Sequence, residues 1–167
     1  MAFSIDIKLE KLPQSLQKGF ANEIIEKFYK TAVNTLMIKL KNKMIKATPV
    51  ATGLSRTSWK LKRAKIIDKF IEGQVRTSSF ALLIVDEGRK PGGRKPPILP
   101  LRIWLRRKLN ITDEAELFTA SEGLQSKIAR RGIKAKRTFT NTFEKFKPEI
   151  KQTMESATSK ITKALSK

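Results

Sequence analysis

The sequence predicts an α+β protein with a long N-terminal helix, a small antiparallel β-sheet and further helices in its C-terminal half. Apolar residues recur every four positions in the first quarter of the chain, as in a helix. The spacing then changes to a rough alternation typical of strands, and helical spacing returns towards the C-terminus. With 167 residues and 40% hydrophobic content, the chain is long enough for one hydrophobic core.

The first predicted element is a long amphipathic helix that begins at Pro13 and ends at Thr48-Pro49. Proline fits the first turn of a helix because its missing N–H has no partner there, and the residue before a proline is disfavoured in the helical region. The predicted buried stripe consists of Leu16, Phe20, Ile24, Phe28, Ala32, Leu36, Leu40 and Met44, widened by Ile25, Tyr29, Met37 and Ile45.

A β-hairpin is predicted to follow the helix. Residues 49–53 have the proline and glycine content of a turn. Residues 54–67 alternate apolar and basic side chains and predict one strand, Asp68-Lys69 supplies the reversal, and residues 70–77 predict the second strand. Gly73 inside that second strand indicates either a β-bulge or a displaced turn.

The segment after the hairpin predicts a short apolar element, a loop and a short helix. Ser78 or Ser79 starts the apolar element and Gly88 ends it; the pattern fits a short helix or a buried strand equally. Residues 89–97 hold three prolines and two glycines and therefore predict a loop. A short helix is expected after Pro100, carrying Leu101, Trp104, Leu105 and Lys108.

Two further helices complete the prediction. The first starts at Thr112 and closes at Arg130-Arg131-Gly132, with acidic residues at its start and basic residues at its end, as the helix dipole favours. The second has a near-heptad apolar stripe from Phe139 to Leu165, with a break or kink expected at Lys147-Pro148. We therefore expect one α+β domain over residues 1–146 and a helical extension over residues 147–167 that docks on a neighbouring subunit.

The composition argues against an enzyme. The chain has no cysteine and no histidine, so it lacks disulfides, thiolate metal ligands and the commonest general base. Asp86-Glu87 is the one close carboxylate pair outside a helix start, and a solvated or ion-paired role is favoured because adjacent side chains point apart. No catalytic residue, metal or cofactor is predicted.

The chain has neither the pattern of a secretory signal nor an apolar run long enough to span a membrane. We therefore expect assembly in the cytoplasm and no membrane partner.

The net charge of +21 predicts an anionic partner. Between Gly88 and Thr112 there is no acidic residue, and the basic residues there are Arg89, Lys90, Arg94, Lys95, Arg102, Arg106, Arg107 and Lys108. Three interpretations remain: contact with a nucleic acid backbone, contact with an acidic subunit face, or a solvated loop. Trp59 and Trp104 lie in this basic setting and fit base stacking, but their apolar neighbours favour core packing.

The order of short motifs resembles the lambdoid-phage gene-product-ten family of tail components, also described as tail completion or neck proteins. The matching residues between Leu16 and Phe146 are Thr48, Pro49, Thr52, Gly53, Trp59, Gly88, Pro97, Trp104 and Gly132. The family often has Asp at the position of Ala51, and residues 147–167 have no counterpart.

The resemblance implies a long helix packed on a small antiparallel sheet. It also implies a structural virion protein at the neck or head-proximal tail, assembled as a homo-oligomeric ring of six or twelve copies around the DNA channel. Its expected partners are head-tail connector, tail terminator or tail tube proteins and, non-specifically, genomic DNA. The alternatives are a free basic nucleic-acid-binding protein and, more remotely, a metal-dependent nuclease built on Asp86.

Overall fold

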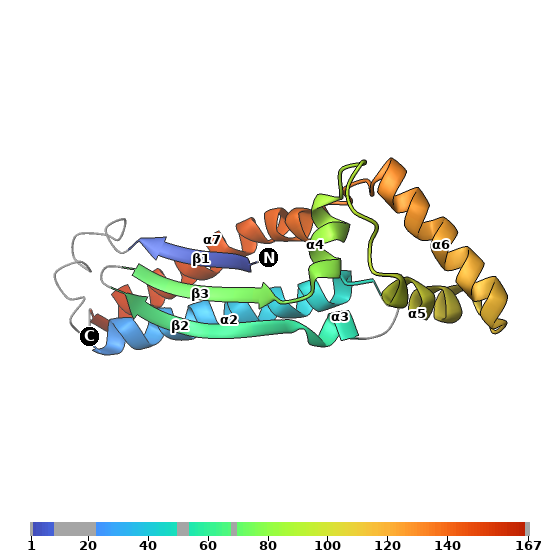
Figure 1. Ribbon diagram of the computed structural model, residues 1–167. Helices are drawn as coiled ribbons and strands as arrows, with labels where there is room; N and C mark the ends of the chain where they lie inside the picture. The colour runs from blue at the N-terminus through green and yellow to red at the C-terminus, as the bar shows by residue number, and fades with distance from the viewer. Residues whose placement is uncertain (1, 9–22, 50–53, 68–69, 166–167) are drawn as a thin grey trace. The chain divides into compact units, whose positions relative to one another are not determined.

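The computed structural model describes residues 2–8, 23–49, 54–67 and 70–165 (Figure 1). The chain forms two compact units. The first comprises Met1–Ala47, Trp59–Ser78 and Asn141–Lys167, and the second comprises Thr48–Ser58 and Ser79–Thr140. The elements are β1 (Ala2–Lys8), α2 (Glu23–Ala47), α3 (Leu54–Thr57), β2 (Trp59–Ile67), β3 (Phe70–Thr77), α4 (Phe80–Glu87), α5 (Ile98–Leu109), α6 (Glu114–Arg131) and α7 (Thr138–Leu165). The predicted α+β class is confirmed.

The first unit contains a three-stranded antiparallel sheet in the order β1-β3-β2 (Figure 1). The predicted hairpin is confirmed, since β2 and β3 pair with Ile67 opposite Phe70. The predicted reversal at Asp68-Lys69 lies outside the described residues. The third strand, β1, was not predicted; it pairs with β3 and places Phe3 opposite Val75.

The prediction of strand structure from residue 54 was wrong for the first residues. Leu54–Thr57 form the single helical turn α3, and the strand begins at Trp59. The hydroxyl of Ser58 donates to the carbonyl of Ser55 at 2.7 Å, and the guanidinium of Arg56 donates to the carbonyl of Thr48. Such local hydrogen bonds to the backbone favour a turn over an extended strand.

A β-bulge lies opposite Gly73. The pairing register shifts between Lys62 and Lys65, so β2 has one residue more than β3 at this point. The N–H of Ala64, in the bulge, donates to the side-chain oxygen of Asn34 on α2 at 2.8 Å. Of the two interpretations of Gly73, the bulge is therefore correct, although the extra residue belongs to the partner strand.

Helix α2 packs on one face of this sheet, as expected. Its predicted start at Pro13 lies outside the described residues, and its predicted end at Thr48-Pro49 is confirmed. Phe28 was expected in the buried stripe but is 37% exposed, because a spacing of four residues drifts around a helix of 3.6 residues per turn. The buried side chains are Ile25, Tyr29, Val33, Leu36, Met37, Leu40 and Met44.

Helix α7 runs without a break through Pro148, so the break expected there is wrong. A proline removes one helical hydrogen bond, but contacts with α2 hold the helix on both sides of it. Phe146 is buried under the ammonium of Lys43, 5.4 Å from the ring centre. Glu149 accepts from Lys39 at 3.0 Å and lies 3.3 Å from Lys43. The Lys39 hydrogen bond lowers the pKa of Glu149, with burial opposing it.

The C-terminal half of α7 also packs on α2. Ala157 and Ile161 are buried, and the Tyr29 hydroxyl lies 2.9 Å from the Thr158 hydroxyl. Burial raises the pKa of Tyr29, and this hydrogen bond opposes the increase. The compact units divide the chain elsewhere than after residue 146, where an extension was predicted. Docking of residues 147–167 on a neighbouring subunit stays a prediction.

Trp59 belongs to the core of the first unit, as its apolar neighbours predicted. Its side chain is 2% exposed, and its ring lies 6.5 Å from the ring of Phe3. Phe3 also contacts Phe143 of α7 at a ring distance of 5.2 Å. The strand β1 thus joins the sheet to α7 through aromatic contacts.

Gly73→Ala is expected to destabilise the first unit. A Cβ at this position would lie 2.7 Å from Val33 Cγ1 and 2.9 Å from Met37 Cγ, so these side chains or helix α2 itself would have to shift. Overpacking of this kind costs about 1–3 kcal/mol. Urea unfolding followed by circular dichroism measures it, and an unchanged midpoint would contradict the close approach of α2.

Gly123→Ala is the matched control and is expected to raise the free energy of unfolding, whereas Gly73→Ala lowers it. Gly123 lies inside α6, and nothing lies within 4 Å of a Cβ added there. Alanine in an open helix interior is more stable than glycine by about 0.5–1 kcal/mol. The same unfolding experiment should show a small gain in stability.

Candidate polyanion-binding surface

The second unit carries most of the basic residues that the sequence analysis singled out. The apolar element after the hairpin, for which a helix and a buried strand were both open, is the helix α4. Ser79 is its N-cap residue, and Gly88 ends it with a φ of 79°. A Cβ on Gly88 would lie 2.6 Å from the carbonyl oxygen of Ile133, so glycine allows the segment after α6 to lie against the end of α4.

Two predicted helix starts need correction. Helix α5 begins at Ile98, so Pro100 lies within its first turn, where a proline costs no hydrogen bond. Helix α6 is capped by Asp113 rather than Thr112, because the Asp113 carboxylate accepts from the N–H of Glu116 at 2.7 Å. The predicted end of α6 at Gly132 is confirmed.

The loop of residues 89–97 is fastened to the end of α6. Arg89 and Ile133 form an antiparallel bridge with N–H to carbonyl distances of 2.8 and 2.9 Å. The N–H of Gly92 donates to the carbonyl of Ala129 at 2.8 Å, and the Gln125 amide donates to the carbonyl of Pro96 at 2.6 Å. The Arg89 guanidinium donates to the carbonyl of Arg94 within the loop.

The bridge brings together two basic segments that are far apart in the sequence. Residues 123–143 contain no acidic residue, and their basic residues are Lys127, Arg130, Arg131, Lys134, Lys136 and Arg137. The sequence analysis interpreted Arg130 and Arg131 only as partners of the helix dipole. The acid-free run itself was the signal that could have pointed to this second segment.

We call the residues beside the bridge the bridge cluster: Arg89, Lys90, Arg130, Arg131 and Lys134. Arg89 is half-buried, and the other four side chains are exposed. Among the described residues, no carboxylate forms an ion pair with any member of the cluster. The cluster therefore presents unneutralised positive charge. Arg94 and Lys95, further along the loop, are exposed as well.

The remaining predicted basic residues lie along α5, and those in its last turns lie away from the loop. Helix α5 spans 12 residues at about 1.5 Å each, and α6 begins near the end of α5 and diverges from it (Figure 1). Arg102 and Arg106 both pair with Glu114 at the start of α6, at 2.5 Å for Arg102, while Arg107 and Lys108 are exposed. The predicted single basic region is therefore spread over two ends of the α5–α6 hairpin.

The family-motif residues are placed as follows. Thr48 is buried and Pro49 is exposed, while Thr52 and Gly53 lie outside the described residues. Gly132 allows the close approach of Arg89, since a Cβ there would collide with the Arg89 carbonyl oxygen. Pro97 is the N-cap residue of α5. Trp104 is 37% exposed, so the expected core packing is wrong for this tryptophan.

Asp86 has a structural position that the sequence did not suggest. It was expected to be solvated or ion-paired, but its side chain is 1% exposed. Its carboxylate accepts from the N–H of Phe139 at 2.6 Å, and from both the N–H and the hydroxyl of Thr140. These groups belong to the first turn of α7, whose N–H groups have no partner within the helix. Asp86 therefore caps α7 from a distant part of the chain.

Within the described ranges, no three acidic side chains come close enough together to hold a metal ion.

The same ranges contain no helix with the length and apolar character that crossing a bilayer requires. Comparisons of the chain with protein-family models, with curated proteins and with solved structures found no match.

Asp86→Ala is expected to lower the free energy of unfolding by at least about 2 kcal/mol, because it leaves buried donors at the start of α7 without an acceptor. Asp86→Asn keeps one acceptor oxygen and should cost less. Thermal and urea unfolding measure both. The matched control is the exposed neighbour Glu87, for which Glu87→Ala should stay within about 0.5 kcal/mol of the wild type. Equal effects at the two positions would contradict the capping role.

Proposed function

We propose that the protein is a structural component of a tailed-bacteriophage virion, at the neck or the head-proximal tail, where copies form a ring around the DNA channel. Its role is to bind phosphate backbone without sequence preference and without catalysis. The observation that carries the proposal is the bridge between Arg89 and Ile133, which holds two acid-free basic segments next to each other.

The electrostatics of the bridge cluster favour a polyanion. Like charges within about 8–10 Å repel one another at physiological salt, and an anionic partner relieves that repulsion. DNA backbone suits the cluster because the cations are exposed and spread along a loop and a helix end. Binding to phosphates also releases counterions, which adds affinity at low salt.

The placement in a virion rests on the resemblance to the gene-product-ten family. The observed long helix on a small antiparallel sheet agrees with the fold that this resemblance implies. A second candidate is a free nucleic-acid-binding protein, which the same basic surface favours. The two candidates differ in where the protein is found and in whether it assembles.

The DNA contact is tested by reversing three exposed members of the bridge cluster, in the variant Lys90→Glu/Arg131→Glu/Lys134→Glu. Binding to a labelled duplex is measured by fluorescence anisotropy over a range of salt concentrations. Each lost phosphate contact reduces the salt slope by about 0.9, so the slope should fall by about two to three. The proposed DNA contact is wrong if the slope is unchanged.

The matched control reverses three exposed cations of strand β2, in the variant Lys60→Glu/Arg63→Glu/Lys65→Glu. It changes the net charge by the same amount but lies in the other unit. If only the overall positive charge matters, DNA binding should weaken equally in both variants. A local contact should weaken the bridge-cluster variant far more.

Virion placement is tested by quantitative mass spectrometry of purified particles from the source culture. The proposal expects six or twelve copies per particle. A protein that binds duplex tightly as a monomer and is absent from particles would establish the free nucleic-acid-binding alternative.

A further inference from the structure

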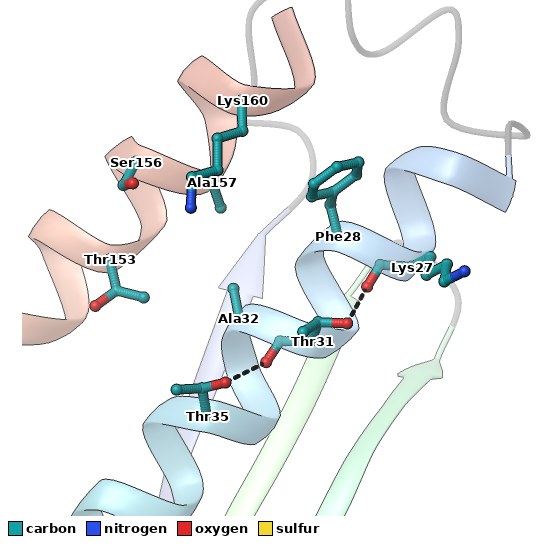
Figure 2. Close-up of a pocket in the computed structure, with 9 residues that line it drawn as sticks. All are labelled: Lys27, Phe28, Thr31, Ala32, Thr35, Thr153, Ser156, Ala157 and Lys160. Carbon is teal, nitrogen blue, oxygen red and sulfur yellow. Dashed lines mark hydrogen bonds between the residues drawn. The ribbon is translucent and has the colours of Figure 1, made fainter. Parts of the chain in front are cut away.

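The first unit has a groove between helices α2 and α7 (Figure 2). Its volume is about 610 Å³. Phe28 and Ala32 of α2 face Ala157 of α7 across it (Figure 2). The other lining residues are Lys27, Thr31, Thr35, Thr153, Ser156 and Lys160.

The groove combines an apolar wall with positive charge. Phe28 is 37% exposed, so its ring is available to an occupant. The hydroxyls of Thr31 and Thr35 donate to carbonyls of their own helix, at 2.7 and 2.9 Å. These donors are therefore already used, and the α2 side of the groove offers chiefly apolar contact. Lys160 is exposed beside it, and no carboxylate pairs with Lys160 in the described part of the chain.

Helix α6 carries an exposed stripe of complementary character. Glu114, Phe118 and Glu122 are four residues apart, so they lie on one face of the helix. Phe118 is 49% exposed, and both glutamates are exposed. Of the two glutamates in this stripe, Glu114 already pairs with Arg102 and Arg106. Glu122 has no ion pair among the described residues and is therefore available to a partner.

We infer that the groove of one copy receives the α6 stripe of a second copy, with Phe118 between α2 and α7 and Glu122 beside Lys160. This inference rests on the proposed function, because it names the contact that builds the ring. The groove volume is ample for one phenyl ring. The two surfaces are different patches of the same chain, and such heterologous contacts generate closed rings when the rotation permits.

Charge selects α6 over the neighbouring helix as the occupant. Helix α5 also exposes apolar side chains, Leu99 and Ile103 among them. They are flanked by Arg102, Arg106 and Arg107, which would bring cations towards Lys160. Copies with a net charge of +21 repel one another, so docking requires local opposite charges.

The apolar part of the contact is tested with Phe118→Ala. Self-association of the full chain is measured by sedimentation velocity over a range of concentrations. Truncation of an aromatic anchor should weaken association by about tenfold or more. The matched control is Phe80→Ala on α4, which removes an even more exposed ring outside the stripe and should leave association unchanged. Equal losses in both variants would refute the α6 contact.

The charge pair is tested by a swap. Glu122→Lys and Lys160→Glu should each weaken self-association by about tenfold, because each places like charges together. The double variant Glu122→Lys/Lys160→Glu restores opposite charges and should recover most of the loss. Both positions are exposed, so circular dichroism should show unchanged folding in all three variants. A double variant as weak as the sum of the single variants overturns the inference.

Two results separate this inference from the proposed function. Hydrogen exchange should show protection of the groove residues of α2 and α7 that increases with protein concentration. Protection independent of concentration, or a wild type that stays monomeric at every concentration, overturns the inference and leaves the virion role standing. If the protein is absent from purified particles, the proposed virion role is wrong. The charge swap at Glu122 and Lys160 then still decides whether the groove receives α6 of a second copy.

Discussion

The antiparallel bridge between Arg89 and Ile133 is the interaction on which the candidate polyanion-binding surface depends. It joins a loop rich in proline and glycine to the end of α6, and it needs glycine at positions 88 and 132 because a side chain at either would collide with backbone atoms. The two segments carry charge of the same sign, so nothing in their electrostatics draws them together. Backbone hydrogen bonds thus hold positive charges at a density that electrostatics alone opposes.

In the first unit, helix α2 has the corresponding organising role. Gly73 lets the helix approach the central strand, and Asn34 satisfies the N–H that the bulge frees. The other side of α2 carries α7, held by the Tyr29–Thr158 contact and by Glu149. Ile38 of α2 is 54% exposed, and the groove beside Phe28 is a further apolar part of the helix that remains uncovered.

The two units thus contribute surfaces of different chemistry. The second unit presents exposed cations that suit a phosphate backbone, and the first unit presents an apolar groove with a cationic edge that suits a helix. A ring component needs both kinds of surface, one for its neighbours and one for its cargo. In the proposed ring, the positive charge that serves DNA binding also opposes self-association, which is why the proposed subunit contact is apolar and locally complementary.

The sequence by itself determined the class of fold, the hairpin strand of residues 70–77, the end of α2 at Thr48-Pro49 and the end of α6 at Gly132. Proline, glycine and apolar spacing act locally, so their effects can be inferred without long-range contacts. Tertiary structure alone decided that β1 completes the sheet, that α7 continues through Pro148, that Asp86 caps α7, and that the loop joins residues 129–133. Each of these depends on partners far away in the chain, whose hydrogen bonds or packing outweigh the local preference.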